Sequence, residues 1–121
     1  MAISVSEVAA LVEAQVAGVA DPKAIALIRS LLVRPRCELR PWDYGAPGTE
    51  YPCWIVAEHV ASQTGIAYCE QGFGPRCPWG LLWLSGEHLS MGMDCSWFSS
   101  LEDAVRDSFA WPDSASHEQK V

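Results

Sequence analysis

The chain contains residue types that could carry out nucleophilic catalysis. A cysteine nucleophile needs a histidine within hydrogen-bonding reach, and the histidine needs an acid to orient it. The candidates are Cys53, Cys69 and Cys95 as nucleophile, His59 and His88 as base, and Glu58 and Glu87 as orienting acid. No G-x-S-x-G sequence is present to place a nucleophile on a strand-to-helix turn. One hypothesis is therefore a small enzyme or small-molecule binder that uses a groove near Cys69, His59 and Glu70.

Two glutamates offer a second kind of chemistry. Glu58 and Glu70 would stand opposite each other if the strands on either side of residues 61–65 paired, and Trp54 and Tyr68 would share their face. Two carboxylates flanked by aromatic rings can do acid–base work on a sugar or ester. The same arrangement suits an acidic and aromatic recognition patch, and charges at strand ends are also often only solvated.

The segment EQGFGPRCPWG, residues 70–80, has two interpretations. It does not match a phosphate-binding loop, because it has no G-x-G-x-x-G pattern and no Lys-Ser/Thr pair, and no helix is expected after it. It is either a rigid turn shaped by its glycines and prolines or a binding loop. In a binding loop, Phe73 and Trp79 would be exposed anchors with Arg76 between them, since aromatic residues and arginine are typical of hot spots.

The cysteines and the apolar runs indicate the cellular setting. The five cysteines are odd in number and widely spaced, which argues against a disulfide framework and favours reduced thiols in the cytoplasm. No pair has the C-x₂₋₄-C spacing of structural zinc, so we expect neither a metal nor another cofactor. The N-terminus lacks a basic leader, and the apolar runs are shorter than the ~20 residues of a membrane span. We therefore expect neither a signal peptide nor a membrane partner.

Acidic charge dominates the chain and is unevenly distributed. The net charge of the 121 residues is −7. Residues 1–40 carry five basic and four acidic side chains (+1), whereas residues 41–121 carry three basic and eleven acidic ones (−8). Phosphate backbones are bound by Lys and Arg, so nucleic acid is not an expected partner. The acidic charge is compatible with a basic protein partner that is steered in by charge, and the alternative is that it serves only to keep the protein in solution.

Six tryptophans are more than a small core holds easily, so two or three should line a groove or an interface. Trp54 and Trp83 lie in the middle of expected strands and are predicted to be core residues. Trp42, Trp79 and Trp111 lie in loops or at a helix end and are predicted to be interface residues. A homodimer interface would use them equally well.

Helix signals stand at both ends of the chain. Ser4–Glu7 reads as a capping box before a stripe of valines, which predicts a helix over residues 5–17. Asp21–Pro22 should begin a second helix that ends at Pro35. Ser99–Glu102 reads as a second capping box that opens the last helix.

Between these helices the residue pattern is typical of short strands. The expected strands cover residues 37–42, 53–60, 65–71, 81–84 and 88–94. Short links between them favour an antiparallel meander. We therefore predict one α+β domain over residues 1–111, with an N-terminal αα-hairpin, a four- to five-stranded meander sheet and a C-terminal helix on one face, in two layers. Residues 112–121 are predicted to be a disordered acidic tail.

The predicted function is that of a small, acidic, tryptophan-rich cytoplasmic binding protein of bacterial type. We expect an inhibitor of the immunity or antitoxin kind that covers a basic partner protein. The predicted contact residues are Glu58, Tyr68, Glu70, Phe73, Arg76, Trp79 and Glu87. The enzyme or small-molecule binder described above is the first alternative, and a homo-oligomeric adaptor without a ligand is the second.

Overall fold

The arrangement of helices and strands is that of an α+β fold. The computed structural model describes residues 3–41, 48–70, 76–86, 89–90 and 96–111. The elements in chain order are α1 (Val5–Ala17), α2 (Pro22–Leu31), β1 (Leu32–Pro41), β2 (Glu50–His59), the 3-10 helix η1 (Val60–Ser62), β3 (Thr64–Tyr68), β4 (Trp79–Trp83), β5 (Trp97–Phe98) and α3 (Leu101–Arg106). The strands form one antiparallel sheet in the order β1-β2-β3-β4-β5. The predicted fold, with its helix pair, meander sheet and C-terminal helix, is confirmed.

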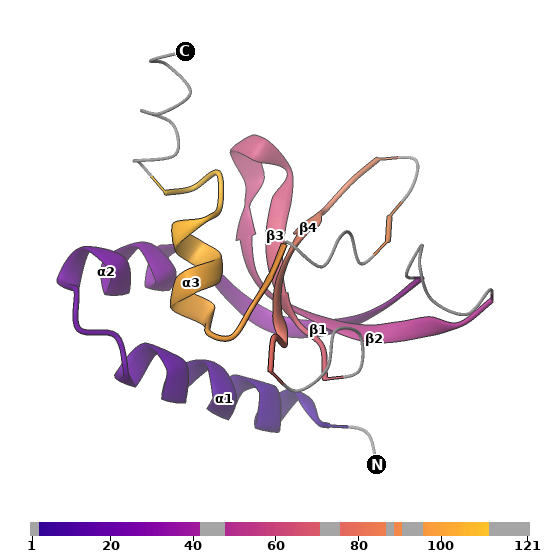
Figure 1. The fold of residues 1–121 in the computed structure, drawn as a ribbon, viewed down its shortest axis with the longest axis horizontal. Coiled ribbons are helices and arrows are strands. Elements are labelled where there is room, and N and C mark those ends of the chain that lie inside the picture. The colour runs from indigo at the N-terminus through magenta and orange to yellow at the C-terminus, as the bar shows by residue number, and fades with distance from the viewer. Residues whose placement is uncertain (1–2, 42–47, 71–75, 87–88, 91–95, 112–121) are drawn as a thin grey trace.

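The three helices lie together on one side of a bent sheet (Figure 1). Their apolar stripes and the facing side of the sheet form one core, which we call the helix-side core. Its buried members are Val8, Val12, Val16, Val19, Ala24, Ile28, Val56, Ala57, Ile66, Trp79, Leu101, Ala104 and Val105. Each large apolar side chain buried here contributes about 1.5–3 kcal/mol, so this packing fixes the helices on the sheet. No helix in the described part of the chain is long and apolar enough to cross a membrane.

The sheet curls toward its opposite face, which holds a second, smaller core. Its buried residues are Cys53, Ile55, Ala67, Cys69, Leu82 and Trp97. Arg40 of β1 donates a hydrogen bond from Nη1 to the carbonyl oxygen of Trp83 in β4, at 2.8 Å. In a flat sheet, strands three positions apart would be separated by about 14 Å, at ~4.8 Å for each pair of neighbours. The sheet therefore curls strongly toward this face, and Arg40 bridges the curl.

The helix starts follow local sequence signals. The predicted capping box is present, because the Ser4 amide donates to the Glu7 carboxylate at 3.1 Å and the Glu7 amide donates to the Ser4 hydroxyl at 3.2 Å. Asp21 caps α2 by accepting from the Lys23 amide at 2.9 Å. The cap of α3 was predicted one residue too early, since the hydroxyl that accepts from the Asp103 amide belongs to Ser100.

The bounds of the strands differ from the predicted ones by up to five residues, most at the junction of α2 and β1, and one strand was not predicted. Helix α2 ends at Leu31 and not at Pro35, because Leu32 already has extended geometry and begins β1 by pairing with Ala57 of β2. The strand β5 (Trp97–Phe98) was not expected. Most of the strand predicted over residues 88–94 lies outside the described residues, and its two described members, at 89–90, are not in a strand. Trp42 and the predicted tail 112–121 also lie outside the described residues.

Candidate functional site

A β-bulge in β2 changes the face that its last residues occupy. The register between β2 and β3 shifts between Ile55 and Ala57, so two residues of β2 advance while β3 advances by one. Val56 and Ala57 therefore both pack into the helix-side core. The strict alternation used in the prediction fails here, and Glu58 does not share the face of Trp54.

Glu58 and Glu70 do not face each other, so the predicted carboxylate pair is wrong. Glu58 lies opposite Gly65 near the β2–β3 turn, whereas Glu70 follows the far end of β3. Glu58 forms an ion pair with Arg36 of β1. Glu70 instead accepts a hydrogen bond from the Tyr68 hydroxyl at 3.3 Å. Acid–base chemistry by these two carboxylates on a shared substrate has no support in this geometry.

His59 and Cys69 also lie at opposite ends of β3. His59 pairs with Thr64, the first residue of β3, and its Nδ1 forms a hydrogen bond with the Ser62 hydroxyl at 2.7 Å. Cys69 follows the last residue of β3, which places it about 16 Å farther along at ~3.3 Å per residue. The predicted groove near Cys69, His59 and Glu70 is therefore not formed by these three side chains.

The thiols of Cys53 and Cys37 are poor nucleophiles. Cys53 is fully buried beside Cys69, and the hydrogen bond with Cys69, followed by burial, raises the pKa of the Cys53 thiol far above its usual value. Cys37 is exposed, yet desolvation of its thiol, with smaller effects from Cys69 and Glu38, raises its pKa. Because the thiolate is the reactive form, a raised pKa lowers the nucleophilicity of both cysteines at neutral pH.

Trp79 is buried and is not the exposed anchor that a binding loop predicts. Its side chain is 2% exposed, and its ring centroid lies 4.9 Å from that of Tyr68. Trp79 pairs with Tyr68 as the first residue of β4, so the end of segment 70–80 belongs to the sheet. Arg76 is exposed. Phe73 and Glu87 lie outside the described residues, so their part in a binding surface stays a prediction.

Tyr68 and Glu70 do line one surface depression, together with α1. This depression is shallow and has a volume of about 430 Å³. It is lined by Ile3, Glu7, Ala10, Leu11, Tyr68 and Glu70. We call it the α1–β3 hollow. Sequence analysis expected Glu7 only as a helix cap, because the sequence does not show that the first turn of α1 lies beside the end of β3.

The titration of Tyr68 tests this local geometry. Burial first, and then the charge and hydrogen bond of Glu70, raise the pKa of the Tyr68 hydroxyl above its usual value of about 10. We expect Glu70→Gln to lower this pKa partway, because burial remains. NMR titration of ¹³Cζ-labelled tyrosine measures it, and Glu50→Gln on β2 is the control that should leave it unchanged. A Tyr68 pKa at or below the usual value would contradict the contact.

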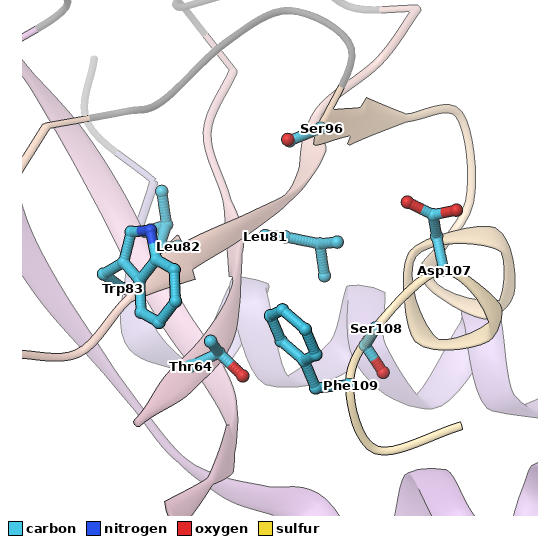
Figure 2. A pocket seen from close by; sticks show the side chains of 8 residues that line it. All are labelled: Thr64, Leu81, Leu82, Trp83, Ser96, Asp107, Ser108 and Phe109. Carbon is cyan, nitrogen blue, oxygen red and sulfur yellow. The ribbon is translucent and has the colours of Figure 1, made fainter. Parts of the chain in front are cut away.

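A second depression lies between β4 and the end of α3 (Figure 2). It has a volume of about 260 Å³ and is lined by Thr64, Leu81, Leu82, Trp83, Ser96, Asp107, Ser108 and Phe109. We call it the β4–α3 cleft. Trp83 is 56% exposed and Phe109 is 50% exposed, and their ring centroids are 6.2 Å apart. Single exposed apolar residues are ordinary, but two adjacent exposed aromatic rings beside a cleft mark a candidate binding site.

Sequence analysis missed this aromatic pair. Trp83 was predicted to be a core residue, which is wrong, and Phe109 was not among the predicted contact residues. Helix α3 ends at Arg106, so Phe109 is no longer at helical spacing from the buried residues. One sequence signal was available, because Asp107 would be unfavourable in the last turn of a longer helix, where the dipole favours basic residues.

Ion pairs neutralise one set of acids and leave another set without a basic partner. Among the described residues, the acids in ion pairs with arginine are Glu13, Asp21, Glu38, Glu58 and Glu102. Those with no ion pair to a described basic residue are Glu7, Glu50, Glu70, Asp103 and Asp107. Two of the latter line the α1–β3 hollow and one lines the β4–α3 cleft. Among the described residues, three of the five acids without an ion pair therefore lie beside partly or fully exposed aromatic and apolar side chains.

Neither metal-ligating groups in the described part of the chain nor similarity to known proteins identifies further residues of these sites. Within the described ranges, no group of three His, Cys, Asp or Glu side chains is placed to hold a metal ion. Comparison of the chain with family models, with curated proteins and with solved structures found no match. The α1–β3 hollow and the β4–α3 cleft are therefore candidate binding sites in the described part of the chain.

Proposed function

We propose that the protein binds a basic partner protein through the α1–β3 hollow, as an inhibitor of the immunity or antitoxin kind. The observation that carries this proposal is the lining of the hollow, in which Glu7, Glu70 and Tyr68 come together and none of the described residues is basic. Ile3 and Leu11 add apolar surface to the same hollow. A lysine or arginine of the partner would meet both carboxylates while its aliphatic stem lies on this apolar surface.

The two sides of the hollow are held in position before any partner arrives. The Glu7 carboxylate is held by the capping box of α1, and the Tyr68 ring packs against the buried Trp79. A preorganised surface loses less conformational entropy on binding, so more of the contact energy contributes to affinity. Tyrosine in such a position is a frequent hot-spot residue.

Overall charge supports the same kind of partner. The chain carries a net charge of −7, which would speed association with a basic protein at low ionic strength. Salt screens this attraction, since the Debye length is about 10 Å at 0.1 M. The association rate should therefore fall steeply as salt is added.

The test compares two double variants with the same change in charge. Glu7→Gln with Glu70→Gln removes both carboxylates of the hollow, and glutamine at position 7 preserves the capping box. Glu50→Gln with Asp103→Asn is the control, because neither residue lines the hollow. From an extract of the source cells, the tagged wild type and the control should retain the same basic protein. The hollow variant should bind that protein about tenfold more weakly, since two exposed ion pairs each contribute up to ~1 kcal/mol.

Cross-linking identifies the surface directly. A benzoylphenylalanine residue at the exposed Ala10 should cross-link to the basic partner, and the same group at exposed Ala61 should not. Retention of identical proteins by both double variants would overturn the proposal. Cross-links between copies of this chain, with a dimer mass in light scattering, would instead support the alternative of a homo-oligomeric adaptor.

A further inference from the structure

We infer that the β4–α3 cleft binds an organic cation with a short aliphatic stem, an alkylammonium or alkylguanidinium group. This inference is independent of the proposed function, because the cleft shares no lining residue with the α1–β3 hollow. In the view of Figure 2, the aromatic pair extends from Trp83 at one end of the cleft to Phe109 in the middle, beside Leu81, and the carboxylate of Asp107 lies at the other end. A ligand that is both apolar and positively charged satisfies both ends at once.

The aromatic end is suited to a cation and to the methylene groups next to it. The indole of Trp83 and the ring of Phe109 lie 6.2 Å apart between centroids, with their planes tilted by 41°. Both rings are about half exposed, so their faces are accessible from the cleft. The negative face of an aromatic ring attracts an ammonium or guanidinium group, and tryptophan does so most strongly.

The carboxylate end has no positive charge to neutralise it. Asp107 forms no ion pair with any described basic residue, and its neighbour Arg106 is engaged by Glu102 at 2.8 Å and by Asp21 at 3.3 Å. Arg106 also lies over the ring of Trp111, with its Cζ 4.6 Å from the ring centroid, so its guanidinium is engaged by three neighbours. The negative charge of Asp107 is therefore available to a ligand at this end of the cleft.

The other polar groups favour a ligand that donates hydrogen bonds. The Ser108 hydroxyl already donates to the Val105 carbonyl at 2.6 Å, and the Thr64 hydroxyl already bonds with Ser62 at 2.6 Å. None of the described residues that line the cleft is basic, so an anion there would meet the Asp107 carboxylate without a compensating positive charge. A cation with N–H donors is the complementary ligand.

The backbone that carries both rings is fixed. The Trp83 carbonyl accepts from Arg40, and Trp83 pairs with Thr64 in the sheet. The turn that carries Phe109 is closed by hydrogen bonds from the Trp111 amide to the Ser108 carbonyl, at 3.1 Å, and from the Ala110 amide to the Ser108 hydroxyl, at 3.3 Å. The site is thus largely formed without its ligand, as is usual for binding pockets.

Volume limits the size of the ligand. Pockets for drug-sized molecules occupy about 300–1,000 Å³. The cleft, at about 260 Å³, lies below this range. It therefore fits a group of the size of a lysine or arginine side chain, which either a free amine or a protein can supply.

The experiment titrates ¹⁵N-labelled protein with defined probes and follows the indole N–H signal of Trp83, identified with Trp83→Leu. The probes are n-butylammonium, n-butylguanidinium, the neutral n-pentanol, and the capped peptides acetyl-Gly-Lys-Gly-amide and acetyl-Gly-Arg-Gly-amide. We expect saturable shifts with the cations and not with pentanol. Tighter binding of a capped peptide than of the free cations would indicate a protein side chain as the natural ligand, and the reverse would indicate a small amine.

Matched variants locate the binding. Asp107→Asn and Phe109→Leu should each weaken binding of n-butylguanidinium about threefold or more, from the loss of the charge or of one ring. Asp103→Asn, the same change one turn earlier on α3 and outside the cleft, should leave binding unchanged. Equal binding of pentanol, no saturable shift with any cation, or equal weakening by Asp103→Asn and Asp107→Asn would overturn the inference. All three substituted side chains are at least partly exposed, so folding should survive, and the dispersion of the spectrum checks this.

Discussion

Replacement of Arg40 by methionine is expected to lower the free energy of unfolding by about 3 kcal/mol. The Arg40 side chain is 2% exposed and joins β1 to β4 across the curled sheet. Its Nη2 lies 2.7 Å from the Glu38 carboxylate, and its Nη1 donates to the Trp83 carbonyl at 2.8 Å. Methionine fills much of the same volume but donates no hydrogen bond, so the Trp83 carbonyl loses the Arg40 donor and Glu38 keeps only its ion pair with the more exposed Arg36. Urea unfolding followed by tryptophan fluorescence measures the loss.

The matched control is Arg36→Met on the same strand. Arg36 also pairs with Glu38, and in addition with Glu58, but its side chain is 45% exposed. Because exposed ion pairs contribute little, this variant should lose less than about 1 kcal/mol. Equal losses in the two variants would contradict a bridging role for the buried guanidinium of Arg40.

The ion pair between Arg40 and Glu38 also makes the free energy of unfolding depend on pH. Burial of Glu38 opposes its ionisation, but hydrogen bonds from Arg40 and Arg36 outweigh this effect and hold its pKa below the usual value. A pKa lowered in the folded state adds stability above the unfolded value of about 4.3, and this stability is lost as pH falls through the folded pKa. The difference between wild type and Arg40→Met should therefore be largest near neutral pH and shrink below about pH 4.

Substitution of Gly80 by alanine is the second change with a large expected effect. A Cβ at Gly80 would overlap the indole ring of Trp97, with Cε3 only 2.6 Å away. Trp97 is 4% exposed and is held in the closed face of the sheet, so the ring has little room to move. Overpacking of this kind costs about 1–3 kcal/mol. Thermal and urea unfolding should both show the loss.

Gly18→Ala provides the control for the Gly80 variant. Gly18 has an ordinary φ of −85°, and an added Cβ would come no nearer than 3.6 Å to another atom. This change should be neutral or stabilising by up to about 1 kcal/mol, because it reduces the entropy of the unfolded chain. A double-mutant cycle with Trp97→Leu should recover part of the loss at Gly80. Additive losses in that cycle would show that the contact with Trp97 is not the cause.

Local signals explain what could be predicted from the sequence. The cap of α1 depends on Ser4 and Glu7 alone, and the start of α2 depends on Asp21 and Pro22, so short-range patterns were sufficient. The antiparallel order followed from short connections, which favour pairing between neighbours in sequence. The α+β architecture could therefore be derived without knowledge of any long-range contact.

The site required information that local patterns do not contain. One extra residue at the β2 bulge places Glu58 on the other face of the sheet from Trp54. Counting alternate residues along the strand does not reveal such a shift. Trp79 and Trp83 stand at the two ends of β4 on the same face, yet only Trp79 is buried, because α3 is too short to cover the other end. The α1–β3 hollow likewise depends on where α1 packs along the sheet, which is a tertiary property.

The contact between α1 and α3 has a consequence for the order of events in folding. Gln15 accepts a hydrogen bond from the Leu101 amide, 86 residues later, at 3.0 Å. Strands β1 to β4 pair with their neighbours in sequence and can form from short-range contacts, whereas the valines of α1 are covered fully only when α3 docks. During synthesis, we therefore expect the valines of α1 and Trp79 to become fully covered only after α3 has left the ribosome. Until then, the partly covered core is expected to be open to aggregation and to chaperones.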